Sequence, residues 1–234
     1  MKFLDLVKRV YSLSGISGDA PITTVAQKGE FGRLVDWTAD AGEEIERAHT
    51  DWKFLQHDFT VNTVTDQRAY LITACTDNVA VAAMTVAKFS QWKLDSFRIY
   101  LQSAGVATQR VLYFLGYDTF RYLYMKGTEL SGSPAYFTIR PHDSAILLGQ
   151  KPNDVYVVTG EFWVGASRMS ADADVPAMPA RFHMAIVHRA LMYYASFEEA
   201  MGKYVAHKLE FDKINGTLEI DQLPAIELAP PLVS

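Results

Sequence analysis

Two aspartates and a histidine are the residues of this sequence best suited to acid–base chemistry. Asp172 and Asp174 precede a predicted helix, and His183 lies in its first turn. Two neighbouring carboxylates can act as an acid and a base, or can hold a cation. The interpretation we favour is that they cap and solvate the loop before the helix. A small hydrolase using these three residues is therefore the least favoured function considered for this chain.

Metal and thiol chemistry have even less support in the sequence. His183 and His188 are five positions apart, so a helix turns them about 140° from each other and one metal ion cannot bind both from the same face. Cys75 is the only cysteine, which excludes an intramolecular disulfide, and we expect it to be a small buried residue. Glycine-rich phosphate loops, the dinucleotide-binding glycine pattern, H-E-x-x-H and G-x-S-x-G are all absent. We expect no enzyme activity, no metal and no cofactor.

The charge argues against a protein that grips nucleic acid. The chain has 234 residues and a net charge of −5, from 27 acidic and 22 basic side chains. Binding to DNA depends mainly on clustered lysine and arginine. The aromatic residues mostly alternate with aliphatic ones, which is typical of a core or a subunit interface and not of a base-stacking platform. The charged start of the chain does not resemble a signal peptide, and we expect a soluble protein made in a reducing compartment.

Three amphipathic helices are predicted to position these residues, at 2–13, 24–55 and 180–205. The second begins at a capping box, in which Thr24 and Gln27 would satisfy exposed backbone N–H groups. Its apolar row includes Trp52, and its opposite face is acidic. The acidic residues are Asp36, Asp40, Glu43, Glu44 and Asp51. The third helix has two apolar rows, which indicates burial over a wide arc. These rows contain Met184, Val187, Leu191 and Tyr194.

The middle of the chain changes to the two-residue period of strands. Strands are predicted at 59–64, 69–72, 92–100, 135–139, 145–148 and 155–163, with a short helix within 111–125. Both a strand and a helix fit residues 79–89. The last three strands suggest an antiparallel meander or part of a sandwich.

The last segment, 218–234, has three prolines and scattered aliphatic residues, and Asn215-Gly216 before it suggests a turn. It could be a disordered end, but its aliphatic content favours an extended arm that docks in a groove or pairs with a strand edge. The candidate docking residues are Leu223, Pro224, Ile226, Leu228 and Leu232. We therefore predict an α+β fold. Its parts are a helical part at 1–57, a mainly antiparallel β domain at 58–178, a C-terminal helix at 179–216 packing on the N-terminal helices, and an arm at 217–234.

Taken in order, four motifs resemble the head-to-tail adaptor proteins of tailed bacteriophages. The first is Ala41-Gly42-Glu43-Glu44-Ile45 with His49-Thr50-Asp51-Trp52. The second runs from Lys151-Pro152-Asn153-Asp154 to Phe162-Trp163. The third is Asp172-Ala173-Asp174-Val175-Pro176, and the fourth is Phe182-His183 followed by Ile186-Val187-His188-Arg189-Ala190-Leu191. The resemblance spans roughly residues 24–206, and the long stretch at 103–133 departs from it.

This resemblance implies a structural virion protein at the neck, assembled in the cytoplasm of the host bacterium. Adaptors of this family form a ring, usually of twelve copies, that docks below the portal, extends the DNA channel and provides a platform for the tail. The expected partners are other copies of the chain, the portal, and a tail or nozzle protein, with no membrane. DNA would pass without specific binding, the arm would bind the portal, and the five acids could line the channel. Trp52 and the apolar rows would serve the core or the subunit contact. The alternative is another neck or tail-completion ring.

Overall fold

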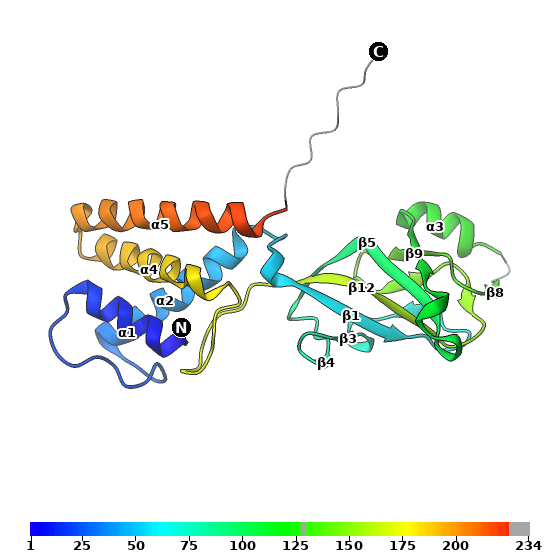
Figure 1. The fold of residues 1–234 in the computed structure, drawn as a ribbon, viewed down its shortest axis with the longest axis horizontal. Helices are drawn as coiled ribbons and strands as arrows, with labels where there is room; N and C mark the ends of the chain where they lie inside the picture. Colours follow the sequence, from blue (N-terminus) through cyan, green and yellow to red (C-terminus); the bar gives the residue numbers. More distant parts are fainter. Residues whose placement is uncertain (128–129, 225–234) are drawn as a thin grey trace, which may run out of the picture. The chain divides into compact units, whose positions relative to one another are not determined.

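The computed structural model describes residues 1–127 and 130–224, and it shows an α+β protein made of two compact units (Figure 1). A helical unit contains residues 1–55 and the chain from residue 166 onward. A β unit contains residues 56–165. The α+β class predicted from the sequence is confirmed.

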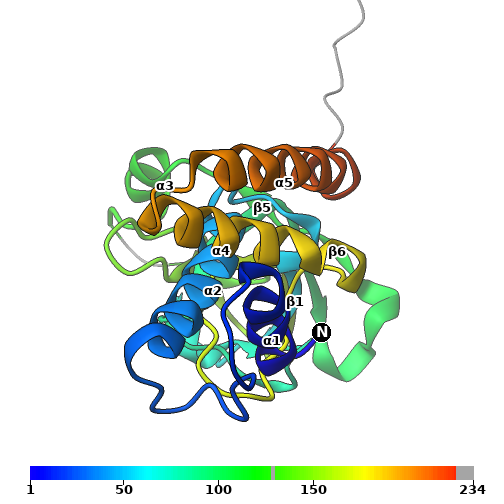
Figure 2. The same cartoon turned by 90° about the vertical axis from the view of Figure 1, so that its left-hand side faces the viewer.

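In the described residues the helical unit has four α-helices, and α4 is the central one. They are α1 (Phe3–Ser14), α2 (Gly29–Arg47), α4 (His183–Phe197) and α5 (Met201–Gln222), with short 3-10 turns at Lys53–Leu55 and Ala180–Phe182. Helix α4 contacts α1 and α2 on one side and α5 on the other (Figure 2). Its two apolar rows follow from this position, because a helix covered on two sides must be apolar over a wide arc.

Helix α2 is shorter than predicted at both ends. It begins at Gly29, whose φ of 64° is left-handed and therefore suits glycine. The predicted capping box at Thr24 is wrong: its N–H and hydroxyl donate to the carboxylate of Asp172, at 2.5 and 2.6 Å. Beyond the end of the helix, Trp52 lies in a loop and Leu55 in a 3-10 turn, and both are buried.

The single long helix predicted at 180–205 is also wrong, because the chain reverses direction after Phe197. Glu199 adopts a left-handed φ of 53°. The Ala200 N–H donates to the carbonyl of Ala195 (2.8 Å), and the Glu199 N–H donates to that of Ser196 (3.3 Å). This is the Schellman pattern of a helix end. Glutamate occupies the position that glycine usually takes, so the sequence carries no glycine signal for this turn.

The C-terminal part of the chain departs further from the prediction. Helix α5 continues through Asn215 and Gly216 to Gln222, and Leu218 is fully buried. A turn at 215–216 and an extended arm over 217–222 are therefore wrong. Leu223 has extended backbone and Pro224 is exposed, while Ile226, Leu228 and Leu232 lie outside the described residues.

Over the residues that the structure describes, the β unit contains two main sheets and one short α-helix. The six-stranded sheet has the order β4-β3-β1-β12-β5-β6, the four-stranded sheet the order β2-β10-β9-β7, and β11 pairs with β8. The larger sheet comprises β1 (Gln56–Asn62), β3 (Thr76–Asp77), β4 (Ala82–Ala83), β5 (Phe89–Leu101), β6 (Arg110–Val111) and β12 (Tyr156–Val164). The other strands are β2 (Ala69–Tyr70), β7 (Tyr113–Phe114), β8 (Ser131–Gly132), β9 (Tyr136–Ile139), β10 (Ile146–Leu148) and β11 (Lys151–Pro152), and the helix is α3 (Tyr117–Tyr124).

The two sheets share one aromatic core, as in a sandwich. Phe97 of β5 stacks on Phe137 of β9 with ring centroids 4.1 Å apart, and Phe59 of β1 contacts Phe97 at 5.2 Å. The predicted meander is only partly present, since β9 and β10 pair with each other but β12 lies between β1 and β5. The short pairs β7–β9 and β8–β11 are parallel, and the other strand pairs are antiparallel, so the β unit is mainly antiparallel as predicted. Residues 79–89 contain β4 and turns, and β5 begins at Phe89.

Candidate interaction surface

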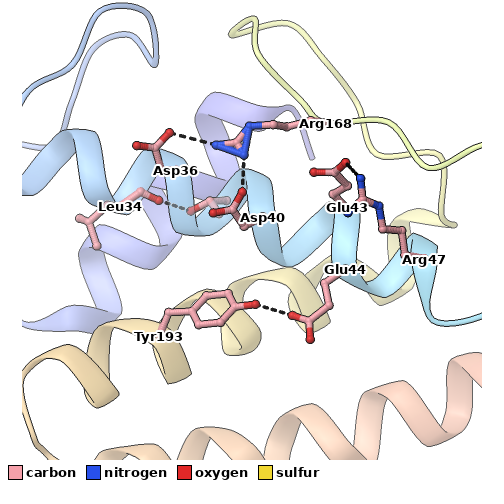
Figure 3. A network of polar contacts seen from close by, with 9 residues as sticks. Leu34, Asp36, Asp40, Glu43, Glu44, Arg47, Arg168 and Tyr193 are labelled. Atoms are coloured by element: carbon pink, nitrogen blue, oxygen red, sulfur yellow. Dashed lines mark hydrogen bonds and ion pairs between the residues drawn. The ribbon is translucent and has the colours of Figure 1, made fainter. Parts of the chain in front are cut away.

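The acidic face of α2 is tied to the loop that enters the helical unit from the β unit. Arg168 in this loop pairs with Asp36 at 3.0 Å and makes a second, closer contact with Asp40 (Figure 3). The buried carboxylate of Glu46 accepts the Ser167 N–H at 3.0 Å, and burial raises the pKa of Glu46. Exposed ion pairs such as those of Arg168 contribute less than about 1 kcal/mol each, so they order the loop more than they stabilise the fold.

A second part of this face joins α2 to α4. Arg189 donates two hydrogen bonds to Glu44, at 2.8 and 2.6 Å, and the Tyr193 hydroxyl donates to the same carboxylate. Burial opposes the charged form of Glu44, but these hydrogen bonds outweigh it and lower its pKa. Arg47 pairs with Glu43 at 2.6 Å, one helical turn away.

The acidic face is therefore largely neutralised. Three arginines pair with four carboxylates of α2, and Asp51, predicted on the same helix, lies in the loop beyond it. The three arginines and the five predicted acids, Asp51 included, together carry a net charge of −2. An open hollow of about 490 Å³ lies beside them, lined by Trp37, Asp40, Glu43, Glu44, Arg47 and Tyr193. The sequence did not indicate that Trp37 lines a hollow. The hollow forms only where Tyr193 of α4 comes beside α2, and a local sequence pattern does not report such a contact between helices.

Asp172 and Asp174 order the helical unit rather than form an acid–base pair. The Asp172 carboxylate accepts hydrogen bonds from Thr23 and Thr24, which lower its pKa. The Asp174 carboxylate accepts the Ser170 and Ala171 N–H groups, which likewise lower its pKa. Their backbone carbonyls also accept the first N–H groups of α1. The favoured loop-ordering interpretation agrees with this geometry, although the helix they cap is α1.

His183 is buried and bonded at both ring nitrogens. Its Nδ1 lies 2.7 Å from the amino group of Met1, and its Nε2 lies 3.0 Å from the carbonyl oxygen of Met178. Burial lowers its pKa. Among the described residues no hydrogen bond joins the side chains of Asp172, Asp174 and His183 to one another, so the hydrolase arrangement is not assembled. The described residues also contain no group of three or more His, Cys, Asp or Glu placed to hold a metal ion.

The comparison with protein families decides what kind of protein this is. The family model described as SU10 adaptor protein matches residues 1–229. The chain belongs to this family. Its members are phage head-to-tail adaptors, so the chain is a structural phage protein of the virion neck and not of an enzyme class. The family implies association with portal and tail proteins and oligomerisation.

The match extends beyond the region of resemblance and includes residues 103–133. No curated protein matches the adaptor. Among the described residues, none of its helices is both long and apolar enough to cross a membrane.

The predicted core residues of the adaptor fall into two groups. Trp52, Val187 and Leu191 are buried within this single copy. Met184 and Tyr194 are half-buried, and the Tyr194 ring lies 6.3 Å from that of Trp37. Cys75 is buried as expected, which raises its pKa to about 12.

A histidine pair joins α4 to α5 in the adaptor, and the sequence did not reveal it because the two residues are on separate helices. The Nδ1 atoms of His188 and His207 are 3.3 Å apart. Burial lowers the pKa of both histidines. At His188 the charge of Glu210 opposes this lowering and that of Arg9 adds to it. At His207 the ring of His188 and the charge of Lys203 lower the pKa further. The folded chain thus binds fewer protons than the unfolded chain just below the ordinary pKa of 6.5.

We therefore expect the helical unit to lose stability as the pH falls through about 6.5, and not as the pH rises. The part of this loss that comes from the pair should be below about 1 kcal/mol, because both rings are partly exposed. His183, whose pKa burial also lowers, adds to the loss in the same direction. Thermal unfolding of the adaptor between about pH 7.5 and 5.5 measures it. His207→Gln should reduce the pH dependence, whereas His142→Gln, at a side chain 72% exposed, should leave it unchanged. An identical pH profile for His207→Gln and the unmodified chain would contradict this role of the pair.

Proposed function

We propose that this adaptor forms a ring that docks below the portal, extends the DNA channel and provides the platform to which the tail attaches. The family match over residues 1–229 carries this proposal. Twelve copies is the number expected from the family resemblance. The engagement of Asp172, Asp174 and His183 in local structure agrees with a role without catalysis.

The acidic face of α2 is proposed to line the channel. Net negative charge repels the phosphates of DNA and disfavours adhesion. Because Arg47, Arg168 and Arg189 pair with the carboxylates, the face offers DNA no unpaired cluster of cations and only a small repulsive charge. A ring in which Asp36, Asp40 and Glu43 lie on the outer surface would contradict this orientation.

The arm that begins at Leu223 is proposed to bind the portal. Its candidate contacts are Leu223, Pro224, Ile226, Leu228 and Leu232. Helix α5 ends at Gln222 and its buried Leu218 precedes the arm. The arm can therefore be removed without removing a buried residue of the described fold.

The test compares the full chain with a variant lacking residues 223–234 in binding to the portal of the same phage. We expect at least a tenfold loss of portal affinity with an unchanged melting temperature. A full-length variant carrying Ile226→Ser, Leu228→Ser and Leu232→Ser is the matched control for chain length, and it should lose binding too. Undiminished portal binding without the arm would contradict the proposal. Binding to a tail tube protein instead of the portal would indicate a tail-completion ring.

A further inference from the structure

The last two turns of α5 are helical although their residue types disfavour a helix. Asn215 and Gly216 are poor helix formers, which is why the sequence predicted a turn there. Glu219 and Asp221 add two carboxylates at a helix C-terminus, where the partial negative charge of the backbone repels them, and the last turn contains no basic residue. The helix nevertheless continues to Gln222, so side chains from outside this turn must stabilise it.

Three side chains from distant segments contact the last turn. The guanidinium of Arg181 pairs with the carboxylate of Asp221, and the ammonium group of Lys53 donates to the Asp221 carbonyl oxygen at 3.3 Å. The imidazole of His49 lies 3.6 Å from the carboxylate of Glu219. Arg181 and Lys53 thereby supply the positive charge that the end of α5 lacks. We call His49, Lys53 and Arg181 the α5 clamp.

The members of the α5 clamp are held by the core of the helical unit. The guanidinium of Arg181 lies 4.8 Å from the centre of the ring of Phe182, which is buried. The ring of His49 lies 4.9 Å from that of Trp52, which is also buried, and Lys53 directly follows Trp52. Figure 1 shows the end of α5 beside the cyan segment that follows α2 and carries Lys53. Two buried aromatic residues therefore fix the positions from which the clamp reaches α5.

The α5 clamp acts on the end of the helix more than on the stability of the whole unit. The paired side chains are exposed, Arg181 and Asp221 by 61 and 38% and His49 and Glu219 by 36 and 38%. Exposed ion pairs stabilise a fold only weakly. Helix ends, however, fray at a small cost in free energy, so weak contacts are sufficient to keep them folded. The clamp thus determines whether residues 219–222 stay helical.

The end of α5 is also the start of the arm. Leu223 has extended backbone, and its N–H still donates to the carbonyl of Glu219 at 3.0 Å. The chain therefore leaves the helix at a fixed point. Each residue that unwound from α5 would add freely rotating backbone to the arm, and a binding partner would have to order it again at a cost in conformational entropy.

We propose that His49, Lys53 and Arg181 are positioning residues for portal binding, which they promote by fixing the point at which the arm leaves α5. This inference rests on the proposed function of the arm. The clamp acts through the last turn of the helix and needs no contact of its own with the portal.

Arg181→Gln in the full chain tests the inference. The variant keeps a polar side chain but loses the charge that pairs with Asp221. We expect portal affinity to fall about fivefold, with an unchanged melting temperature. Arg33→Gln is the matched control, because Arg33 is also exposed and lies 4.6 Å from the centre of a phenylalanine ring, that of Phe197, but near the start of α2. The control should bind the portal as the unmodified chain does.

A double-mutant cycle separates positioning from a direct contact of Arg181 with the portal. In a chain that carries Asp221→Asn, the carboxylate that Arg181 holds is already absent. Arg181→Gln should then lower portal affinity by less than about twofold further. An equal fivefold loss in both backgrounds would mean that Arg181 itself contacts the portal, and would overturn the inference.

Hydrogen exchange measures the same effect without the portal. Arg181→Gln should speed the exchange of the amides of residues 220–223 severalfold and leave those of α4 unchanged. Unchanged exchange at the end of α5 would contradict the clamp. If removal of residues 223–234 weakens portal binding but Arg181→Gln does not, the inference alone fails. If their removal leaves portal binding unchanged, the proposed role of the arm fails with it.

Discussion

Replacing Leu218 with alanine should lower the free energy of unfolding of the helical unit by about 2–5 kcal/mol. Leu218 is 0% exposed and is the one fully buried residue of α5. Truncating a buried leucine removes its transfer free energy and leaves a cavity. The loss is large compared with the total stability of a protein domain, which is about 5–15 kcal/mol. Urea unfolding followed by the helical circular dichroism signal measures it.

Leu209→Ala is the matched control on the same helix, because Leu209 is 66% exposed. Its effect on the free energy of unfolding should stay within about 0.5 kcal/mol. Equal effects of the two changes would mean that Leu218 is not buried and that residues 217–222 belong to the arm. The pair of variants therefore decides where the folded unit ends and the arm begins.

Replacing Trp52 with alanine should lower the free energy of unfolding by about 3–5 kcal/mol. Trp52 is fully buried, its indole N–H donates to the carbonyl of Ile45 at 3.1 Å, and its ring lies 4.9 and 5.2 Å from those of His49 and Phe54. The indole thereby folds the loop after α2 back onto the end of the helix. Denaturant unfolding followed by circular dichroism at the helical band is the measurement.

Trp52→Phe is the control that keeps most of the apolar packing. Its cost should be only about 1–2 kcal/mol, because the Ile45 carbonyl still accepts the Ala48 N–H. A loss as large as that of Trp52→Ala would show that the indole hydrogen bond, and not packing, holds this loop. A loss below about 1 kcal/mol for Trp52→Ala would contradict the burial.

Both changes bear on assembly as well as on stability. Helix α5 packs on α4, and Leu218 is its buried residue, while Trp52 holds the loop after α2 against the end of that helix. Leu218→Ala and Trp52→Ala should therefore weaken portal binding by destabilising the folded helical unit. Removal of residues 223–234 should weaken portal binding without changing the melting temperature.

The positions of the charged side chains change what the net charge implies about DNA. As a total, the net charge of −5 argues against strong binding to DNA. In the structure, Arg168 and Arg189 reach the acids of α2 from positions more than 120 residues away in the chain. The repulsion that DNA would meet is accordingly weaker than a count of carboxylates suggests.

Local sequence patterns were enough to predict many of the strands and helices of this protein. The two-residue period predicted the strands around Phe59, Phe97, Phe137 and Val158, because alternating burial on a sheet is set by residues close in the chain. Helix α1 and the existence of α2 and α4 follow from the same kind of local signal. The ordered motifs also sufficed to indicate the adaptor family, since they need only sequence order and spacing.

Tertiary contacts decided the rest. Thr24 has the right sequence context for a capping box, yet the distant Asp172 offers its N–H a charged acceptor, and that stronger hydrogen bond wins. Glu199 takes a left-handed turn without glycine because the packing of α5 on α4 compensates its strain. Leu218 lies in a segment predicted to be an extended arm, but it is buried because that segment is part of α5, which packs on α4. Local sequence determined which segments are helix or strand, while contacts between distant segments determined where those segments end and which faces they leave exposed.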